Sequence, residues 1–120
     1  MIRVLIVDDQ QLLRRGLKLL LAQSPEIQVV NTCASAAETL VSLHNSEVDV
    51  VLAYAIMPGM DGPGLVEQCR TLWPSLPVII LTTFDDATIV RRSIKAGAAG
   101  FLLKDVSPTT LAEAITAAYD

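Results

Sequence analysis

Residues 49–62 read DVVLAYAIMPGMDG, a run of β-favouring residues that leads directly into a turn rich in Gly, Pro and Asp. A continuous apolar run of this kind is typical of a strand buried on both faces of a parallel sheet. The turn residues end the strand, so Tyr54 is expected at its carboxyl end. Ligands of α/β proteins gather at that end of a sheet, and here the position is occupied by a phenol.

The same pattern recurs along the chain, where short apolar runs alternate with segments of helical periodicity. The predicted strands cover residues 4–7, 28–33, 48–53, 78–81 and 100–103. The predicted helices lie near residues 10–23, 35–45, 63–72, 86–96 and 108–119, with starts marked by Ser35, Pro63 and Ser107-Pro108. Right-handed crossovers then give an open parallel sheet covered by helices on both sides. The sequence therefore predicts an α/β fold of five βα units.

Composition restricts the class of protein. At 120 residues the chain is long enough for one packed domain and too short for two. The net charge is −4, and the basic pairs Arg14-Arg15 and Arg91-Arg92 lie far apart in the sequence, so this domain alone is not expected to bind nucleic acid. The apolar runs are too short for a membrane span, and the start of the chain lacks a signal-peptide layout, which predicts a cytoplasmic domain.

The cysteines and the histidine do not predict a metal site. Cys33 and Cys69 form no CxxC spacing, and His44 is the only histidine. Neither a zinc site nor a disulfide framework is therefore expected. Cys33 is instead predicted to be a packing residue within a strand.

The predicted strand ends bring chemically active side chains to one edge of the sheet. The first strand ends in Asp8-Asp9, the third in Tyr54, the fourth in Thr82-Thr83 and the fifth in Lys104. Two acids, a hydroxyl and an ammonium group on one rim suit a divalent cation and a phosphoryl group. One acidic partner is missing from that set.

Four motifs carry a resemblance to a known family. They are VLIVDDQ at 4–10, MPGMDG at 57–62, VIILTTFDD at 78–86 and AGAAGFLLKD at 96–105. In this order and spacing the chain resembles the receiver domain of bacterial two-component response regulators, most closely the NarL/FixJ branch with a LuxR-type output domain. The resemblance covers residues 1–120 and implies the flavodoxin-like fold with strand order 2-1-3-4-5. It also implies a DNA-binding output domain in a longer parent protein.

The resemblance assigns family roles to five residues of this sequence. It matches Asp8 and Asp9 to the metal-binding acids, Thr82 to the switch hydroxyl, Phe101 to the switch aromatic and Lys104 to the phosphate-sensing lysine. Each also has a structural interpretation that stays open. Asp9 could cap the first helix, Thr82 could be strand-end packing, and Phe101 could be a fixed core aromatic.

In the family pattern, the residue three before the Met-Pro pair is the aspartate that accepts the phosphoryl group, and here it is Tyr54. A phenol with a pKa near 10 is protonated at neutral pH and replaces neither the nucleophile nor the metal ligand. Ala53, Ala55 and Ile56 depart from the family pattern too, which indicates a naturally atypical receiver. Tyr54 is interpreted as a structural plug, with its hydroxyl bonded to Lys104 or to an acid, rather than as a phosphorylation site.

These departures set the expected cofactors and partners. Two carboxylates without a third ligand are expected to hold Mg²⁺ weakly or not at all, with an ion pair to Lys104 as their alternative use. No other cofactor and no enzymatic activity are expected. A histidine kinase partner is doubtful, because its usual acceptor is missing.

The leading functional prediction is a regulatory module that controls a DNA-binding output domain without phosphorylation, through dimerisation or through a ligand or partner. One alternative is phosphotransfer with another acceptor, for which Asp61 is the nearby carboxylate. The other is a small-molecule sensor, because Ile56 and the Tyr54 ring make the mouth of the pocket more apolar.

The two terminal helices predict an interface. Six leucines of the first helix spread over roughly 200°, about twice the width that one sheet-facing helix needs. In the last helix, Ala114 and Ala117 lie on a side away from the sheet-facing residues. We expect a homodimer through the first and last helices, with Leu12, Leu19, Ala114 and Ala117 in the interface. The alternatives are that this surface packs on a linker or output domain, or that the family's other face, around the fourth helix and fifth strand, is used.

Overall fold

The computed structural model describes residues 1–82 and 87–120. Thr83, the FDD portion of the third motif and the predicted helix start at residue 86 lie outside the described residues. Among the described residues, no helix is both long enough and apolar enough to cross a bilayer.

The order of elements is the predicted alternation of strands and helices. The strands are β1 (Ile2–Val7), β2 (Ile27–Cys33), β3 (Val50–Tyr54), β4 (Val78–Thr82) and β5 (Gly100–Leu103). The helices are α1 (Gln11–Leu21), α2 (Ala36–Asn45), α3 (Gly62–Leu72), α4 (Ala87–Ala96) and α5 (Pro108–Tyr119). Predicted and observed boundaries differ by at most two residues.

Helix starts follow the predicted capping signals. The side chains of Ser35 and Ser107 accept hydrogen bonds from the backbone N–H groups of Glu38 and Thr110. At the start of α3 the cap is Asp61, whose carboxylate accepts from the N–H of Gly64, with Pro63 in the first turn. Short polar side chains thus satisfy N–H groups that the helices leave unpaired.

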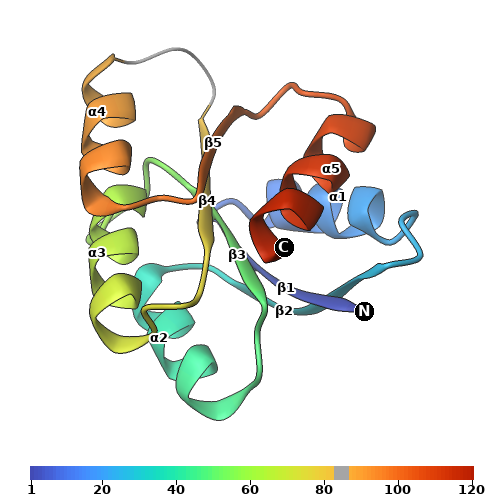
Figure 1. Ribbon diagram of the computed structural model, residues 1–120, viewed down its shortest axis with the longest axis horizontal. Coiled ribbons are helices and arrows are strands. Elements are labelled where there is room, and N and C mark those ends of the chain that lie inside the picture. Colours follow the sequence, from blue (N-terminus) through green and yellow to red (C-terminus); the bar gives the residue numbers. More distant parts are fainter. Residues whose placement is uncertain (83–86) are drawn as a thin grey trace.

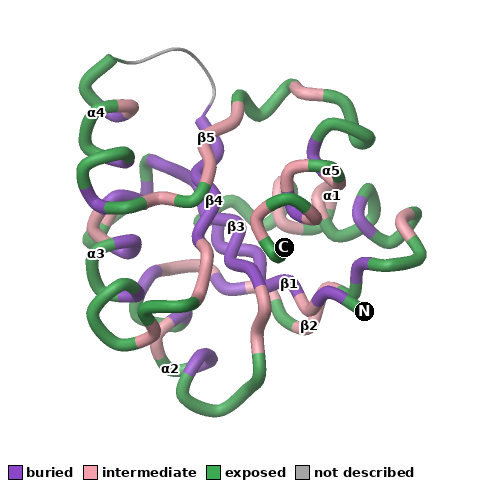
Figure 2. Tube along the Cα trace, viewed as in Figure 1, coloured by how far each residue is buried: buried purple, intermediate pink, exposed green. Residues whose placement is uncertain are grey.

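All five strands are parallel and follow the order β2-β1-β3-β4-β5, which confirms the flavodoxin-like topology. Figure 1 shows α1 and α5 side by side on one face of the sheet, with α2, α3 and α4 on the other. β3 and β4 lie in the middle of the sheet, and every residue of both strands is buried. The buried part of the trace in Figure 2 is concentrated along these central strands. Cys33 and Cys69 are free and buried, and Cys33 ends β2 as predicted.

The loop after β3 folds back tightly onto the end of that strand. The N–H of Gly62 donates to the carbonyl of Ala55 at 2.8 Å, and the N–H of Ala55 donates to the carbonyl of Leu81 at 2.8 Å. A Cβ atom on Gly62 would lie 2.6 Å from the carbonyl oxygen of Tyr54 and 2.9 Å from the Cα of Ala55. The absence of a side chain at Gly62 therefore fixes where β3 ends and how Tyr54 is presented.

We expect Gly62→Ala to lower the free energy of unfolding by about 1–3 kcal/mol, because the new methyl group meets rigid backbone. Gly16→Ala is the matched control, since a Cβ atom on this α1 glycine would meet no atom within 4 Å. The control is expected to raise the free energy of unfolding by about 0.5–1 kcal/mol through helix propensity. Urea denaturation of both variants measures the two effects, and a harmless Gly62→Ala would contradict the tight loop.

Candidate functional site

A cavity of about 320 Å³ lies at the carboxyl ends of β1, β3, β4 and β5. It is lined by Asp8, Asp9, Gln10, Leu13, Tyr54, Ile56, Thr82 and Lys104. The predicted convergence of strand-end side chains is confirmed for five residues, Asp8, Asp9, Tyr54, Thr82 and Lys104. The position agrees with the general rule for ligand sites in open parallel sheets.

Asp8 continues β1 into the cavity and is only 1% exposed. Its Oδ1 accepts a hydrogen bond from the N–H of Gln10 at 2.9 Å, and the guanidinium of Arg14 donates to its backbone carbonyl at 2.7 Å. Its Oδ2 is buried and has no hydrogen-bond partner among the described residues. Burial disfavours the charged form and raises the pKa of the Asp8 carboxyl from 3.8 to about 6.

Tyr54 is the last residue of β3 and is 8% exposed. Its hydroxyl oxygen is buried and has no hydrogen-bond partner in the described part of the chain. Burial, together with the negative charge of Asp8, raises the pKa of the phenol to about 12. The prediction that this hydroxyl bonds to Lys104 or to an acid is therefore wrong, whereas the ring is buried as a plug requires.

Asp9 and Lys104 are exposed at the mouth of the cavity. The alternative role of Asp9 as a helix cap is wrong, because the N-cap residue of α1 is Gln10, whose side chain makes no capping hydrogen bond. Across residues 1–82 and 87–120, Lys104 forms no ion pair with Asp8 or Asp9. Its backbone N–H donates to the carbonyl of Thr82 at 2.6 Å, which joins the ends of β4 and β5.

The two residues matched to the family switch occupy different environments. Thr82 ends β4, lines the cavity and is 2% exposed. Phe101 is half-buried in β5, pairs in register with Ile80 and packs against the hydrophobic core. Phe101 therefore lies outside the cavity lining, as the core-aromatic interpretation requires.

The donor set does not fit a magnesium site. Among the described residues, no group of three or more His, Cys, Asp or Glu side chains could hold a metal ion. Asp8 binds a proton more tightly than an ordinary carboxyl, and the neutral phenol of Tyr54 brings no charge. Mg²⁺ prefers several charged or carbonyl oxygens in a nearly ideal octahedron, and this cavity supplies few.

Asp61, the alternative acceptor, is engaged elsewhere. Its Oδ1 accepts from the N–H of Gly64 at 2.9 Å, and its Oδ2 forms an ion pair with Arg92 at 2.9 Å. The residue is the N-cap of α3 and does not line the cavity. Its carboxylate therefore joins the loop after β3 to α4.

Sequence reasoning missed two lining residues, Gln10 and Leu13. Gln10 follows the acids directly, and its N–H holds Asp8 in place. Leu13 lies in the first turn of α1, which begins two residues after Asp9, so its position close to the acids could have been expected from the sequence.

Comparison with curated proteins shows where the chain belongs. The response regulator receiver domain model matches residues 4–116. Transcriptional regulatory protein LnrK of Bacillus subtilis is 35% identical over 96% of this chain and 52% of its own length. The nitrate/nitrite response regulator protein NarP of Escherichia coli is 38% identical over 96% of this chain and 54% of its own length. The chain thus spans about half the length of these relatives.

Solved structures agree with that assignment. The receiver domain of the putative response regulator NarL from Mycobacterium tuberculosis has a TM-score of 0.89 and 32% identity, covering 98% of this chain and 95% of that chain. A LuxR-family response regulator from Aurantimonas has a TM-score of 0.91 and 26% identity, covering 98% of this chain and 84% of that chain. The chain belongs to the response regulator receiver domain family, among relatives of the NarL and LuxR type.

Proposed function

We propose that this domain is an atypical receiver that controls a DNA-binding output domain without being phosphorylated. Receiver domains of transcriptional regulators are in general signalling domains rather than enzymes. The observation that carries the proposal is the buried, neutral phenol of Tyr54 at the end of β3, three residues before Met57-Pro58. A protonated phenol of this kind is a poor nucleophile toward a phosphoryl donor.

Two of the other described carboxyl groups, those of Asp8 and Asp61, are poorly placed to act as replacement acceptors. Asp8 is a buried carboxyl, and Asp61 is held by the α3 N-terminus and by Arg92. Phosphorylation of Tyr54 itself would require its buried hydroxyl to reach a kinase active site. The remaining routes of control are a change of assembly and the binding of a partner or ligand, and a histidine kinase has no evident role.

We expect no phosphoryl transfer to the wild-type domain. After incubation with acetyl phosphate and millimolar Mg²⁺, the intact mass should be unchanged, because the acceptor position is occupied by the neutral phenol of Tyr54. Mg²⁺ alone should leave the melting temperature almost unchanged, since the donor set is poor. A stable gain of one phosphoryl mass, or a saturable stabilisation by Mg²⁺ that Asp9→Ala abolishes, would overturn this part of the proposal.

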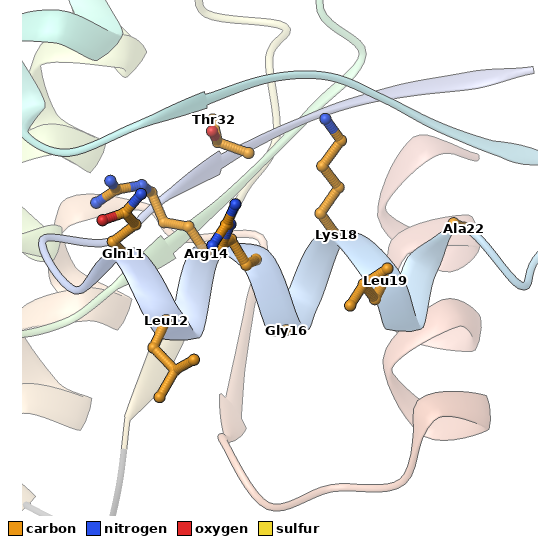
Figure 3. A pocket seen from close by; sticks show the side chains of 9 residues that line it. Gln11, Leu12, Arg14, Gly16, Lys18, Leu19, Ala22 and Thr32 are labelled. Carbon is orange, nitrogen blue, oxygen red and sulfur yellow. The ribbon is translucent and has the colours of Figure 1, made fainter.

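The assembly route rests on α1 and α5. Leu12 and Leu19 of α1 are 81% and 70% exposed, and α1 contacts α5 on the same face of the sheet. Figure 3 shows Lys18 pointing to the side of α1 on which Thr32 of β2 lies, and Leu12 pointing to the other side. A cavity of about 850 Å³ runs along this helix. The exposed leucines therefore form an apolar surface with cationic side chains next to it.

The contribution of α5 is smaller than the sequence predicts. Ala117 is exposed, whereas Ala114 is half-buried and packs against the core. We therefore place Leu12, Leu19 and Ala117 in a symmetric homodimer interface, with Ala114 behind them. A standard interface would bury about 800 Å² per partner, and its formation needs no phosphoryl group.

Light scattering at micromolar concentration should report a dimer that Leu12→Asp or Leu19→Asp converts to a folded monomer. The reason is that a carboxylate in an apolar interface loses its hydration. Val41→Asp is the matched control, because Val41 is 62% exposed on α2 at the other face of the sheet. A wild-type monomer, or a dimer that survives both leucine substitutions, would refute this interface.

A small-molecule sensor is the second candidate function. It is favoured by the cavity itself, which has two buried polar atoms without partners in the described part of the chain and the 59% exposed Ile56 in its wall. In this version, a ligand rather than a phosphoryl group would change the output. The whole protein's DNA target and its output domain remain part of the proposal, since the chain spans about half of its curated relatives.

A further inference from the structure

The cavity at the strand ends contains polar atoms whose hydrogen-bonding capacity is unused. The Oδ2 of Asp8 and the hydroxyl of Tyr54 are buried, have no partner among the described residues, and belong to residues that line the cavity. A buried polar atom without a partner costs about 1–3 kcal/mol of stability. The protein's own described hydrogen bonds leave these two atoms without partners, so a molecule in the cavity that reaches them through a small side-chain movement would supply the missing bonds.

The charges of the cavity are separated along the sheet. Asp8 and Asp9 follow β1, whereas Lys104 follows β5, and β3 and β4 lie between them in the strand order. Negative charge therefore gathers at one end of the cavity and positive charge at the other. Between them, Tyr54 and Thr82 present hydroxyl groups from β3 and β4.

This arrangement selects among the classes of small ligand. An anion alone would meet the two acids, and a cation alone would leave the ammonium of Lys104 without a partner. A molecule with an amine at one end and a carboxylate at the other would satisfy both ends. The side chains of Leu13 and Ile56 would contact the apolar atoms between its charges.

The size of the cavity limits the length of such a molecule. Neighbouring strands lie about 4.8 Å apart, so β1 and β5 are separated by about 14 Å across three intervals. A cavity of about 320 Å³ lies at the small end of ligand sites, so it suits a molecule whose charged groups are joined by only a few carbon atoms.

We propose that this cavity binds a small zwitterion, an amine and a carboxylate joined by a short aliphatic chain. The ammonium group donates to the carboxylates of Asp8 and Asp9, and the ligand's carboxylate accepts from Lys104 and from the hydroxyl of Tyr54. This inference rests on the proposed function, because it requires a site that does not take a phosphoryl group. Ligand binding is then the regulatory input of the domain.

The test is a titration with glycine, β-alanine, 4-aminobutyrate and 6-aminohexanoate, followed by the backbone amide NMR signals of Gln10 and Leu103. Butylamine and butyrate at equal ionic strength are the single-charge controls. We expect saturable shifts with 4-aminobutyrate, which should bind about tenfold more tightly than either control, and weaker binding of the shortest and longest members.

Substitutions at exposed positions separate the two ends of the ligand. Lys104→Gln should abolish the preference for 4-aminobutyrate over butylamine, and Asp9→Asn should abolish the preference over butyrate. Lys95→Gln is the matched control, since Lys95 is an exposed cation of α4 outside the cavity. Tyr54→Phe removes one hydroxyl and should weaken binding of 4-aminobutyrate and butyrate, while leaving butylamine unaffected.

Two results would overturn the inference: no saturable binding of any ω-amino acid, or binding that Lys104→Gln and Asp9→Asn leave unchanged. Either result would leave the proposed function standing if acetyl phosphate still adds no mass. Phosphoryl transfer to the wild-type domain would instead remove the proposed function, whatever the amino acids do.

Discussion

Burial of the Asp8 carboxyl next to the Tyr54 phenol is the interaction on which the rest of the site depends. Each residue has an oxygen that lies out of water without a hydrogen-bond partner in the described structure, and this is unfavourable by about 1–3 kcal/mol per group. The arrangement persists because β1 and β3 are fixed by the core on both faces of the sheet. The close approach of Gly62 to the end of β3 then leaves Tyr54 little freedom to move away.

This constraint explains why the site differs from the one that its fold family implies. A third carboxylate at Tyr54 would attract a cation and a phosphoryl donor, whereas the neutral phenol brings no charge and burial alone already disfavours the charged form of Asp8. Lys104 and Asp9 remain at the mouth as exposed, opposite charges without a mutual ion pair. The cavity therefore lies at the same strand ends as the family's site, but its charges suit a ligand other than Mg²⁺ and a phosphoryl group.

The fold could be predicted because its signals are local. Continuous apolar runs predicted β3 and β4, and Ser35 and Ser107 predicted helix starts that the structure confirms. Side-chain partners could not be predicted in the same way. Whether Tyr54 reaches Lys104 depends on the rotamers and depths of both residues, which no spacing in the sequence encodes. Ala114 illustrates the same limit. Helical projection placed it on a side of the last helix away from the sheet, whereas in the structure it is half-buried and packs against the hydrophobic core.

The central claim is that Asp8 occupies a dry, unsatisfied position beside Tyr54, and titration of its side-chain carboxyl carbon by ¹³C NMR tests this directly. A buried carboxyl resists ionisation, so the account predicts a midpoint of about 6 for Asp8 in the free domain. A midpoint at the ordinary value of 3.8 would mean that water or a cation already satisfies the carboxylate, and would contradict the account.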